Sequence, residues 1–155
     1  FVKYPTLESF ADADLNELEQ DVKQCGFYHT KAKNLKEMAN QLIVNFNGEL
    51  PSTMDELLTL SGIGRKTANL IMGDIWKKPA VVTDTHFIRI TGRIGLTENK
   101  EPAKVEKDLV ILIPPQESSD FCHRIVQFGR DVCIARNPHC SVCSLNYFCK
   151  FAEDK

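Results

Sequence analysis

Four cysteines near the end of the chain restrict its fold more than any other feature. Cys133, Cys140, Cys143 and Cys149 lie in "CIARNPHCSVCSLNYFC", a C-x6-C-x2-C-x5-C array. The chain shows no secretory signal pattern, and in that context clustered cysteines favour a metal centre over disulfide bonds. Four thiolates can hold a tetrahedral zinc ion or an iron–sulfur cluster, and this spacing alone does not decide between them. The sequence therefore predicts a C-terminal segment that folds around an inorganic group.

The segment "LSGIGRKTANL" at residues 60–70 is the second constraint. Gly62 and Gly64 flank a single residue, Arg65 and Lys66 follow, and an apolar helix then begins. Glycines allow a sharp turn or a close approach of the backbone to a ligand. The N-terminus of a helix offers free N–H groups to an anion. The segment is therefore either a phosphate-binding hairpin or a plain turn.

Apolar residues recur at helical spacing through most of the chain, and no strand–turn–strand pattern is present. The run "PAVV" is too isolated to build a sheet. In the first half of the chain, helices are predicted over residues 14–25 and from an N-cap at Thr30 to Gly48, and another begins at a cap formed by Thr53 and Glu56. A further helix follows the hairpin and runs through Trp76. The last three predicted helices cover residues 84–94, 102–113 and 118–132. The predicted fold class is all-α.

Size and charge narrow the function classes. A chain of 155 residues fits one domain or two small lobes, and 43% apolar with 26% charged residues is an ordinary soluble composition. A net charge of −2 argues against a globally basic nucleic-acid binder. Residues 65–100, however, carry seven Lys and Arg against three Asp and Glu. Such a local basic face suffices for contact with phosphates.

Three segments together resemble the endonuclease III family, the iron–sulfur branch of the helix-hairpin-helix DNA glycosylases. They are "LSGIGRKTANL", "VVTDTHFIRI" and the four-cysteine array, in the order and at the separations of that family. The resemblance implies a helix-hairpin-helix glycosylase fold. It places a helical barrel lobe over residues 1–83, with the hairpin at 60–66, and a cluster lobe over 84–155 that ends in loop 133–149. It also implies a [4Fe-4S] cluster on the four cysteines, with zinc as the less favoured alternative.

The resemblance identifies Lys66 as the catalytic nucleophile and Asp84 as the second catalytic residue. A lysine amine attacks the sugar C1′ only when it is neutral, and Arg65 and the positive helix end beside it favour that state. Attack displaces the damaged base and leaves a Schiff base, from which β-elimination breaks the strand on the 3′ side. The Asp84 carboxylate can stabilise the cationic sugar and assist proton transfer, although aspartate at this position is also a good helix N-cap.

The same resemblance predicts the contacts with DNA. Gly62 and Gly64 bring the backbone close to a phosphate, and Arg65 adds positive charge. Phe27 matches the residue that fills the gap left by an extruded base, with a core phenylalanine as the alternative. His86 is either a DNA contact or a structural histidine.

The sequence thus predicts a base-excision repair enzyme: a DNA glycosylase with apurinic/apyrimidinic lyase activity on oxidised pyrimidines in damaged double-stranded DNA. The alternative is a non-catalytic helix-hairpin-helix DNA-binding module, or an inactive fragment with a structural metal centre. Family members have two more helices before the position of Phe1, and without them uncovered apolar surface predicts self-association. Reduced thiols and the lack of a membrane span or targeting segment predict a cytoplasmic location, at the nucleoid in a bacterium.

Overall fold

The computed structural model describes residues 2–153, and this range is helical with no strand, as the all-α prediction requires. The helices form two compact units, the first ending at Ala68 and the second beginning at Asn69. This boundary lies inside α5 (Arg65–Asp74), so it differs from the predicted lobe boundary between residues 83 and 84, which stays a prediction. Between residues 2 and 153, none of the helices combines the length and the apolar character that a membrane span requires.

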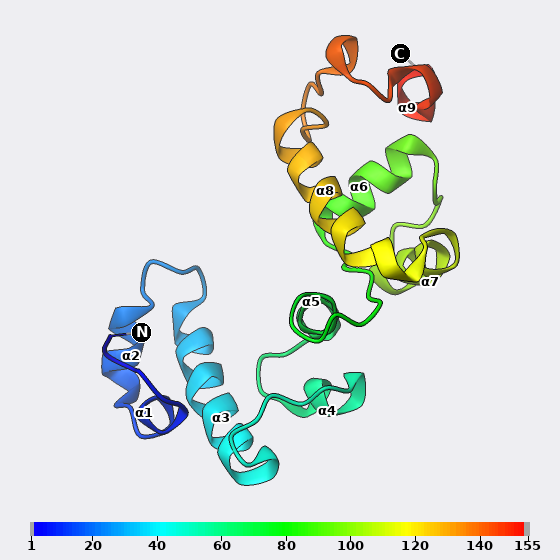
Figure 1. Cartoon of the computed structure of the whole chain (residues 1–155). Helices are drawn as coiled ribbons and strands as arrows, with labels where there is room; N and C mark the ends of the chain where they lie inside the picture. Colours follow the sequence, from blue (N-terminus) through cyan, green and yellow to red (C-terminus); the bar gives the residue numbers. More distant parts are fainter. Residues whose placement is uncertain (1, 154–155) are drawn as a thin grey trace. The chain divides into compact units, whose positions relative to one another are not determined.

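The first unit is built around one long helix. Its helices are α1 (Leu7–Ala11), α2 (Leu15–Asp21), α3 (Tyr28–Phe46), α4 (Met54–Thr59) and the start of α5. Both α1 and α2 pack on α3 (Figure 1). The interior is formed by buried aliphatic side chains, among them Leu18, Ala32, Ala39, Leu42 and Leu57. The long helix is therefore the element on which the rest of this unit rests.

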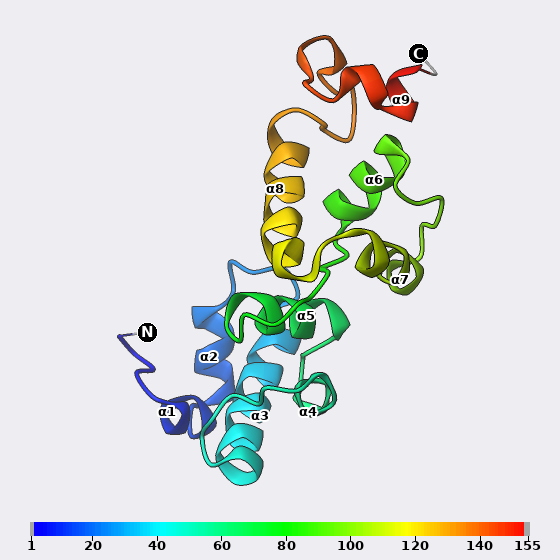
Figure 2. The same ribbon diagram turned by 45° about the vertical axis from the view of Figure 1, so that its right-hand side comes forward.

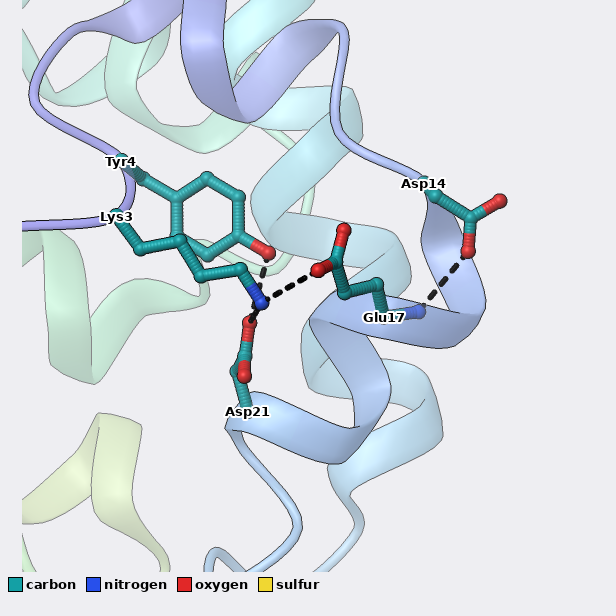
Figure 3. A network of polar contacts seen from close by, with 5 residues as sticks. All are labelled: Lys3, Tyr4, Asp14, Glu17 and Asp21. Atoms are coloured by element: carbon teal, nitrogen blue, oxygen red, sulfur yellow. Dashed lines mark hydrogen bonds and ion pairs between the residues drawn. The ribbon is translucent and has the colours of Figure 1, made fainter.

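A polar network fastens the N-terminal segment to α2 (Figure 3). The Lys3 ammonium lies 2.5 Å from Asp21 Oδ2 and 2.9 Å from Glu17 Oε1, and the Tyr4 hydroxyl donates to Asp21 at 2.8 Å. The hydrogen bonds from Lys3 and then Tyr4 hold the pKa of Asp21 below its usual value. At the other end of α2, Asp14 caps the helix by accepting the Glu17 N–H at 3.0 Å.

Two helix boundaries in the first unit differ from the prediction. The predicted N-cap Thr30 is wrong, because α3 begins at Tyr28 after Phe27, whose φ of 58° is left-handed. Helix α2 ends at Asp21 rather than at residue 25, and a separate turn follows it, closed by a Cys25 N–H to Val22 carbonyl bond of 2.8 Å. The loop between these two helices is consequently longer than the sequence indicated.

The second unit has one hydrophobic core. It contains α6 (Thr85–Ile94), α7 (Pro102–Leu112), the 3-10 helix η1 (Pro115–Glu117) and α8 (Ser118–Asp131). Helices α6 and α8 lie side by side (Figures 1 and 2). The buried side chains of this core are Val81, Phe87, Ile90, Val105, Leu109, Ile113, Cys122 and Ile125. Helix α5 ends at Asp74, two residues before the predicted end at Trp76.

The C-terminal segment has little regular structure. Beyond α8 it forms two 3-10 helices, η2 (Cys140–Val142) and η3 (Asn146–Phe148), and the short α9 (Lys150–Glu153). No residue of these three elements is buried. A segment of this length without buried side chains needs another source of stability. Bonds from its cysteines to a metal centre can provide it.

Candidate active site and cluster loop

The two glycines of the hairpin join α4 to α5 in a tight loop. The Ile63 N–H donates to the Leu60 carbonyl at 3.1 Å, and the Ala68 N–H donates to the Gly64 carbonyl at 2.9 Å. Gly62 has a left-handed φ of 77°, which L residues with a side chain rarely adopt. Gly64 has no such φ, but a Cβ built on it would meet open space. The first glycine therefore makes the turn, and the second leaves the backbone open to approach.

Arg65 and Lys66 form the first turn of α5, and both side chains are exposed. The N–H groups of a first helical turn have no partner within the helix and carry partial positive charge. An anion that meets this end of α5 would therefore contact backbone donors, a guanidinium and an amine together. This arrangement is suited to binding a phosphate beside a nucleophile.

Phe27 presents an apolar ring to solvent. Its side chain is 88% exposed, which rules out the core phenylalanine considered above. Its left-handed backbone is uncommon for a non-glycine residue and carries a conformational cost. An exposed aromatic side chain on a strained loop is suited to a contact outside the chain, and the gap-filling role stays a prediction.

Asp84 is the N-cap of α6. Its Oδ1 accepts the Phe87 N–H at 2.7 Å, and the residue itself is half-buried. The capping role expected of an aspartate at a helix start is therefore present, and it occupies one carboxylate oxygen. Lys66 belongs to the first unit and Asp84 to the second.

His86 lies against α8 and is half-buried. A Cβ built on Gly129 would come within 2.6 Å of His86 Nδ1, and Arg89 Nη2 lies 3.1 Å from the same nitrogen. Arg89 also donates to the carbonyls of Gly129 at 3.2 Å and Cys133 at 3.0 Å. These contacts give His86 a structural role, and its predicted contact with DNA stays untested by them.

The four cysteines line one cavity. Cys133 follows α8, Cys140 begins η2, and Cys143 and Cys149 each follow a 3-10 helix. All four are free thiols of intermediate exposure. The cavity also has apolar walls, formed by Ile94, Phe128, Val132, Leu145 and Phe151 among others. The loop thus brings four thiols to one apolar enclosure.

This donor set supplies four thiolates, the number of cysteine ligands that a [4Fe-4S] cluster takes. In residues 2–153, no three His, Cys, Asp or Glu side chains come close enough to hold one metal ion. A zinc ion would require every sulfur at about 2.3 Å from one point. A [4Fe-4S] cluster is larger, and its cysteine ligands are consequently farther apart around it. Four thiols that line one cavity can supply the ligands of such a cluster.

Donors from α6 and from the loop itself reach two of the four cysteine sulfurs of the cluster loop. Arg93 Nη1 lies 3.3 Å from Cys133 Sγ, and the Leu145 N–H donates to Cys143 Sγ at 3.4 Å. Hydrogen bonds to ligating sulfurs orient them and tune an iron–sulfur cluster. Arg93 in addition donates to the Ile134 carbonyl at 2.8 Å, and its guanidinium lies 4.5 Å from the Phe151 ring centroid. One side chain therefore contacts the start of the loop and α9, the helix that follows the loop.

The sequence analysis missed Arg89 and Arg93. The available signal was their spacing, because residues four apart on a helix share a face. That spacing shows two cations side by side on α6 but does not show what they face. Their acceptors in the cluster loop lie more than 40 positions further along the chain.

Comparison with known proteins defines the class. Residues 1–115 match the family model described as HhH-GPD superfamily base excision DNA repair protein, and residues 133–149 match the iron–sulfur binding domain of endonuclease III. With the hairpin and the four-thiol cavity, these matches define an iron–sulfur DNA glycosylase of base excision repair. The chain is 40% identical to endonuclease III of Synechocystis sp. and 38% identical to that of Bacillus subtilis, over 99% and 100% of its own length. The chain belongs to the endonuclease III family.

Solved structures agree with this assignment. The fold matches a non-covalent endonuclease III–DNA complex with a TM-score of 0.94 at 39% identity, over 99% of this chain and 72% of the other. It matches a thermostable thymine-DNA glycosylase with a TM-score of 0.87 at 28% identity, over 100% of this chain and 73% of the other. The chain spans 70% and 71% of the two bacterial relatives.

The predicted activity class and cofactor are confirmed by these comparisons. The protein is a DNA glycosylase/AP lyase of base excision repair, it binds DNA, and its cofactor is a [4Fe-4S] cluster. Neither the non-catalytic binding module nor the zinc site is favoured. When bound, the cluster holds together the loop that carries its four ligands.

Proposed function

We propose that Lys66 is the nucleophile of this enzyme. The observation that carries this role is its position: an exposed amine in the first turn of α5, directly after the glycine hairpin. A phosphate held by that helix end would place the neighbouring sugar within reach of the amine. Binding and chemistry would then share one short segment of the chain.

The reaction assigned to Lys66 runs through a covalent intermediate. The neutral amine bonds to the sugar C1′, the bond from C1′ to the base breaks, and the base leaves with the bonding electrons and takes up a proton. Loss of the amine proton and opening of the sugar ring give a Schiff base. Removal of a C2′ proton then expels the 3′ phosphate by β-elimination, and water finally releases the enzyme.

Asp84 is proposed as the carboxylate that assists this reaction. A carboxylate near the sugar stabilises positive charge as the glycosidic bond breaks, and it can accept a proton. The hydrogen bond from Phe87 N–H occupies Oδ1 only, so the second oxygen is not required for the cap. Capping and catalysis are therefore compatible in one side chain.

The remaining predicted residues are proposed as contacts with damaged duplex DNA. Gly62 and Gly64 present the hairpin backbone to a phosphate, and Arg65 adds charge beside it. Phe27, exposed and apolar, fills the space of the extruded nucleotide. His86 contacts DNA through the ring edge that Arg89 leaves free.

Oxidised pyrimidines are the proposed lesions. This lesion class follows from the membership of the endonuclease III family. Cleavage of duplexes that each carry a different lesion tests it. Single-turnover cleavage of a duplex that carries one thymine glycol should be much faster than cleavage of one that carries 8-oxoguanine. Equal rates on the two would reject this lesion class while leaving the lyase reaction in place.

Borohydride trapping tests the nucleophile. The cluster-loaded chain is incubated with a duplex containing one abasic site, and borohydride reduces any Schiff base to a stable protein–DNA adduct. Wild type should give the adduct, and Lys66→Ala should give none. Lys107→Ala, which changes an exposed lysine of α7, is the matched control and should trap like wild type.

Two results would reject this role for Lys66. One is the absence of an adduct from wild type whose visible absorption shows a loaded cluster. The other is an adduct of undiminished yield from Lys66→Ala, which would place the nucleophile elsewhere. Peptide mapping of the trapped adduct identifies the modified residue in either case.

We further propose that the chain self-associates through the end of α7. Val110, Ile111 and Leu112 are 53%, 79% and 58% exposed, respectively. Three adjacent exposed aliphatic side chains favour burial against a partner. Light scattering should give a mass above that of the monomer, and Ile111→Lys should reduce it. A monomer at high concentration would contradict this proposal.

A cytoplasmic location is also proposed, because four cysteines that must stay reduced to ligate a cluster favour a reducing compartment. Fractionation of cells that express the tagged protein would test it, and recovery in an oxidising compartment would reject it.

A further inference from the structure

Three polar side chains of α3 converge on one residue of the hairpin loop. Asn34, Glu37 and Gln41 are three and four positions apart, so they share one face of that helix. Ser61, which directly precedes Gly62, donates its N–H to Gln41, and its hydroxyl lies within hydrogen-bond distance of both Asn34 and Glu37. None of the three was identified from the sequence, and no step of the reaction above uses them.

Gln41 makes the shortest of these contacts. Its Oε1 accepts the Ser61 N–H at 2.7 Å in a half-buried position. Its Nε2 lies 3.5 Å from the Thr59 carbonyl, at the limit of hydrogen-bond length. One side-chain amide thus provides a partner both for the carbonyl of Thr59, the last residue of α4, and for the N–H of Ser61 in the loop. The conformation of the loop at Ser61 depends on this residue.

Asn34 acts on the loop in two ways. Its Oδ1 lies 3.2 Å from the Ser61 hydroxyl, which also lies 3.1 Å from Glu37 Oε2 and can donate to either. The side chain also occupies the space beside Gly62: a Cβ there would lie 2.9 Å from Asn34 Cβ and 2.9 Å from Nδ2. Asn34 therefore packs so closely on the turn that only a glycine fits at position 62.

These contacts leave the next amides of the loop unused. Within residues 2–153, the N–H groups of Gly62 and Gly64 donate to no backbone carbonyl, whereas Ser61 and Ile63 are both paired. The paired groups fix the loop to the protein, and the unpaired ones remain for an external acceptor. The pattern is that of a loop arranged in advance for an anion.

The same helix also determines the position of Phe27, which is its N-cap. Asn34 lies seven residues further along, a separation of about 10 Å on the helix axis. One continuous helix therefore connects the residue proposed to fill the DNA gap with the loop proposed to bind phosphate. Its length sets the distance between the two contacts.

We propose that Asn34 and Gln41 are positioning residues that hold the hairpin in its phosphate-binding conformation and in fixed register with Phe27. This inference rests on the proposed contact between the hairpin and DNA. Binding energy then need not be spent on ordering the loop, because α3 orders it before DNA arrives.

Binding as a function of salt tests the proposal. The variants are Gln41→Met, which keeps the shape of the side chain but removes the acceptor, and Asn34→Ala. Asn40→Ala is the matched control, because Asn40 is exposed on the same helix and its side-chain amide donates to the Lys36 carbonyl within that helix. The probe is a duplex with one tetrahydrofuran abasic analogue, and its affinity for the cluster-loaded chain is measured at several salt concentrations.

Gln41→Met and Asn34→Ala should each bind about tenfold more weakly at low salt, the loss of roughly one ordered hydrogen bond. The slope of log K against log salt should fall by about 0.9, the value for one phosphate contact. Asn40→Ala should keep the wild-type affinity and slope. Single-turnover cleavage of a duplex with one true abasic site, at saturating enzyme, should change less than affinity does.

Amide exchange separates positioning from simple loss of fold. In Gln41→Met the Ser61 amide should exchange faster while the α3 amides keep their protection. Unchanged affinity and slope in Gln41→Met overturn the inference, and so does weaker binding with an unchanged slope. If wild type itself shows no salt-dependent binding, the proposed DNA contact fails instead, so the two failures are distinguishable.

Discussion

Gly62 and Gly64 are close in sequence but meet different demands, and alanine should separate them. Gly62→Ala forces a side chain into a left-handed φ of 77° and against Asn34, so it should lower the free energy of unfolding by about 1–2 kcal/mol. Gly64→Ala meets open space and should leave stability nearly unchanged. Both should weaken binding to duplex DNA. Urea unfolding with affinity measurements checks this, and equal losses of stability would show that the turn does not depend on the φ of Gly62.

Asp84 combines a cap with a proposed catalytic role, and two substitutions separate them. Asp84→Ala removes the acceptor of the Phe87 N–H and should cost about 1 kcal/mol of stability, whereas Asp84→Asn keeps an acceptor and should cost a few tenths. Both remove the charge, so both should slow single-turnover cleavage by about 100-fold. Wild-type cleavage by Asp84→Asn would leave the residue with its cap alone.

At the scale of helices, the sequence predicts those ends that local chemistry marks. Asp84 before α6 and Pro102 at the start of α7 are recognisable helix-start residues; α7 begins at the predicted residue, and α6 begins one residue after it, with Asp84 as its cap. Helix α3 does not, because Phe27 is no favoured cap and enters the helix by a left-handed backbone that only tertiary context stabilises. The C-terminal ends of α2 and α5 were also predicted wrongly, because the fraying of a last helical turn has no clear sequence signal.

The network that fastens residues 3 and 4 to α2 should respond to acid. The pKa of Asp21 is lowered from its usual 3.8 by hydrogen bonds from Lys3 and Tyr4. A lowered pKa in the folded state means that the stabilisation is present above about pH 4 and is lost as pH falls through the folded-state value. Amide exchange in α2 should therefore accelerate in that acidic range. Asp21→Asn should show fast exchange at every pH, and an unchanged profile in this variant would assign the acid response to another group.

Arg93 should determine how firmly the cluster loop is held. It contacts the Cys133 sulfur and the Ile134 and Ala135 carbonyls, and it stacks on Phe151. Arg93→Met keeps much of the apolar stem but removes all these donors. The purified variant should lose its visible iron–sulfur absorption several-fold faster than wild type in the presence of a chelator. Arg124→Met, at an exposed position of α8, is the control, and equal rates for the two would show that the loop does not need Arg93.

At the scale of the molecule, the candidate site divides into residues that motifs reveal and residues that only the fold reveals. Lys66, Asp84 and the four cysteines lie in short recognisable segments. Gln41 and Arg89, by contrast, act on partners 20 and 44 positions away, and nothing in a single sequence connects such pairs. The missed residues are accordingly those that orient other groups.

Removal of the cluster should affect one part of the chain and spare another. The elements after α8 bury no residue of their own, so the loop at 133–149 depends on bonds from its four cysteines to the cluster. The hairpin depends instead on α3, within a unit that has its own buried side chains. Hydrogen exchange of a cluster-free chain should therefore be fast over residues 133–153 and unchanged over α3 and the hairpin.

Two cysteine variants make this comparison within the intact chain. Cys149→Ala removes a proposed ligand, whereas Cys25→Ala removes an exposed thiol outside the loop. Cys149→Ala should show the fast exchange of the cluster-free chain, and Cys25→Ala should match wild type. If Cys149→Ala also lost exchange protection in α3, the hairpin would depend on the cluster. The contacts that α3 makes with the hairpin would then be insufficient to hold it. Retained protection over residues 133–153 would instead show that the loop folds without its metal centre.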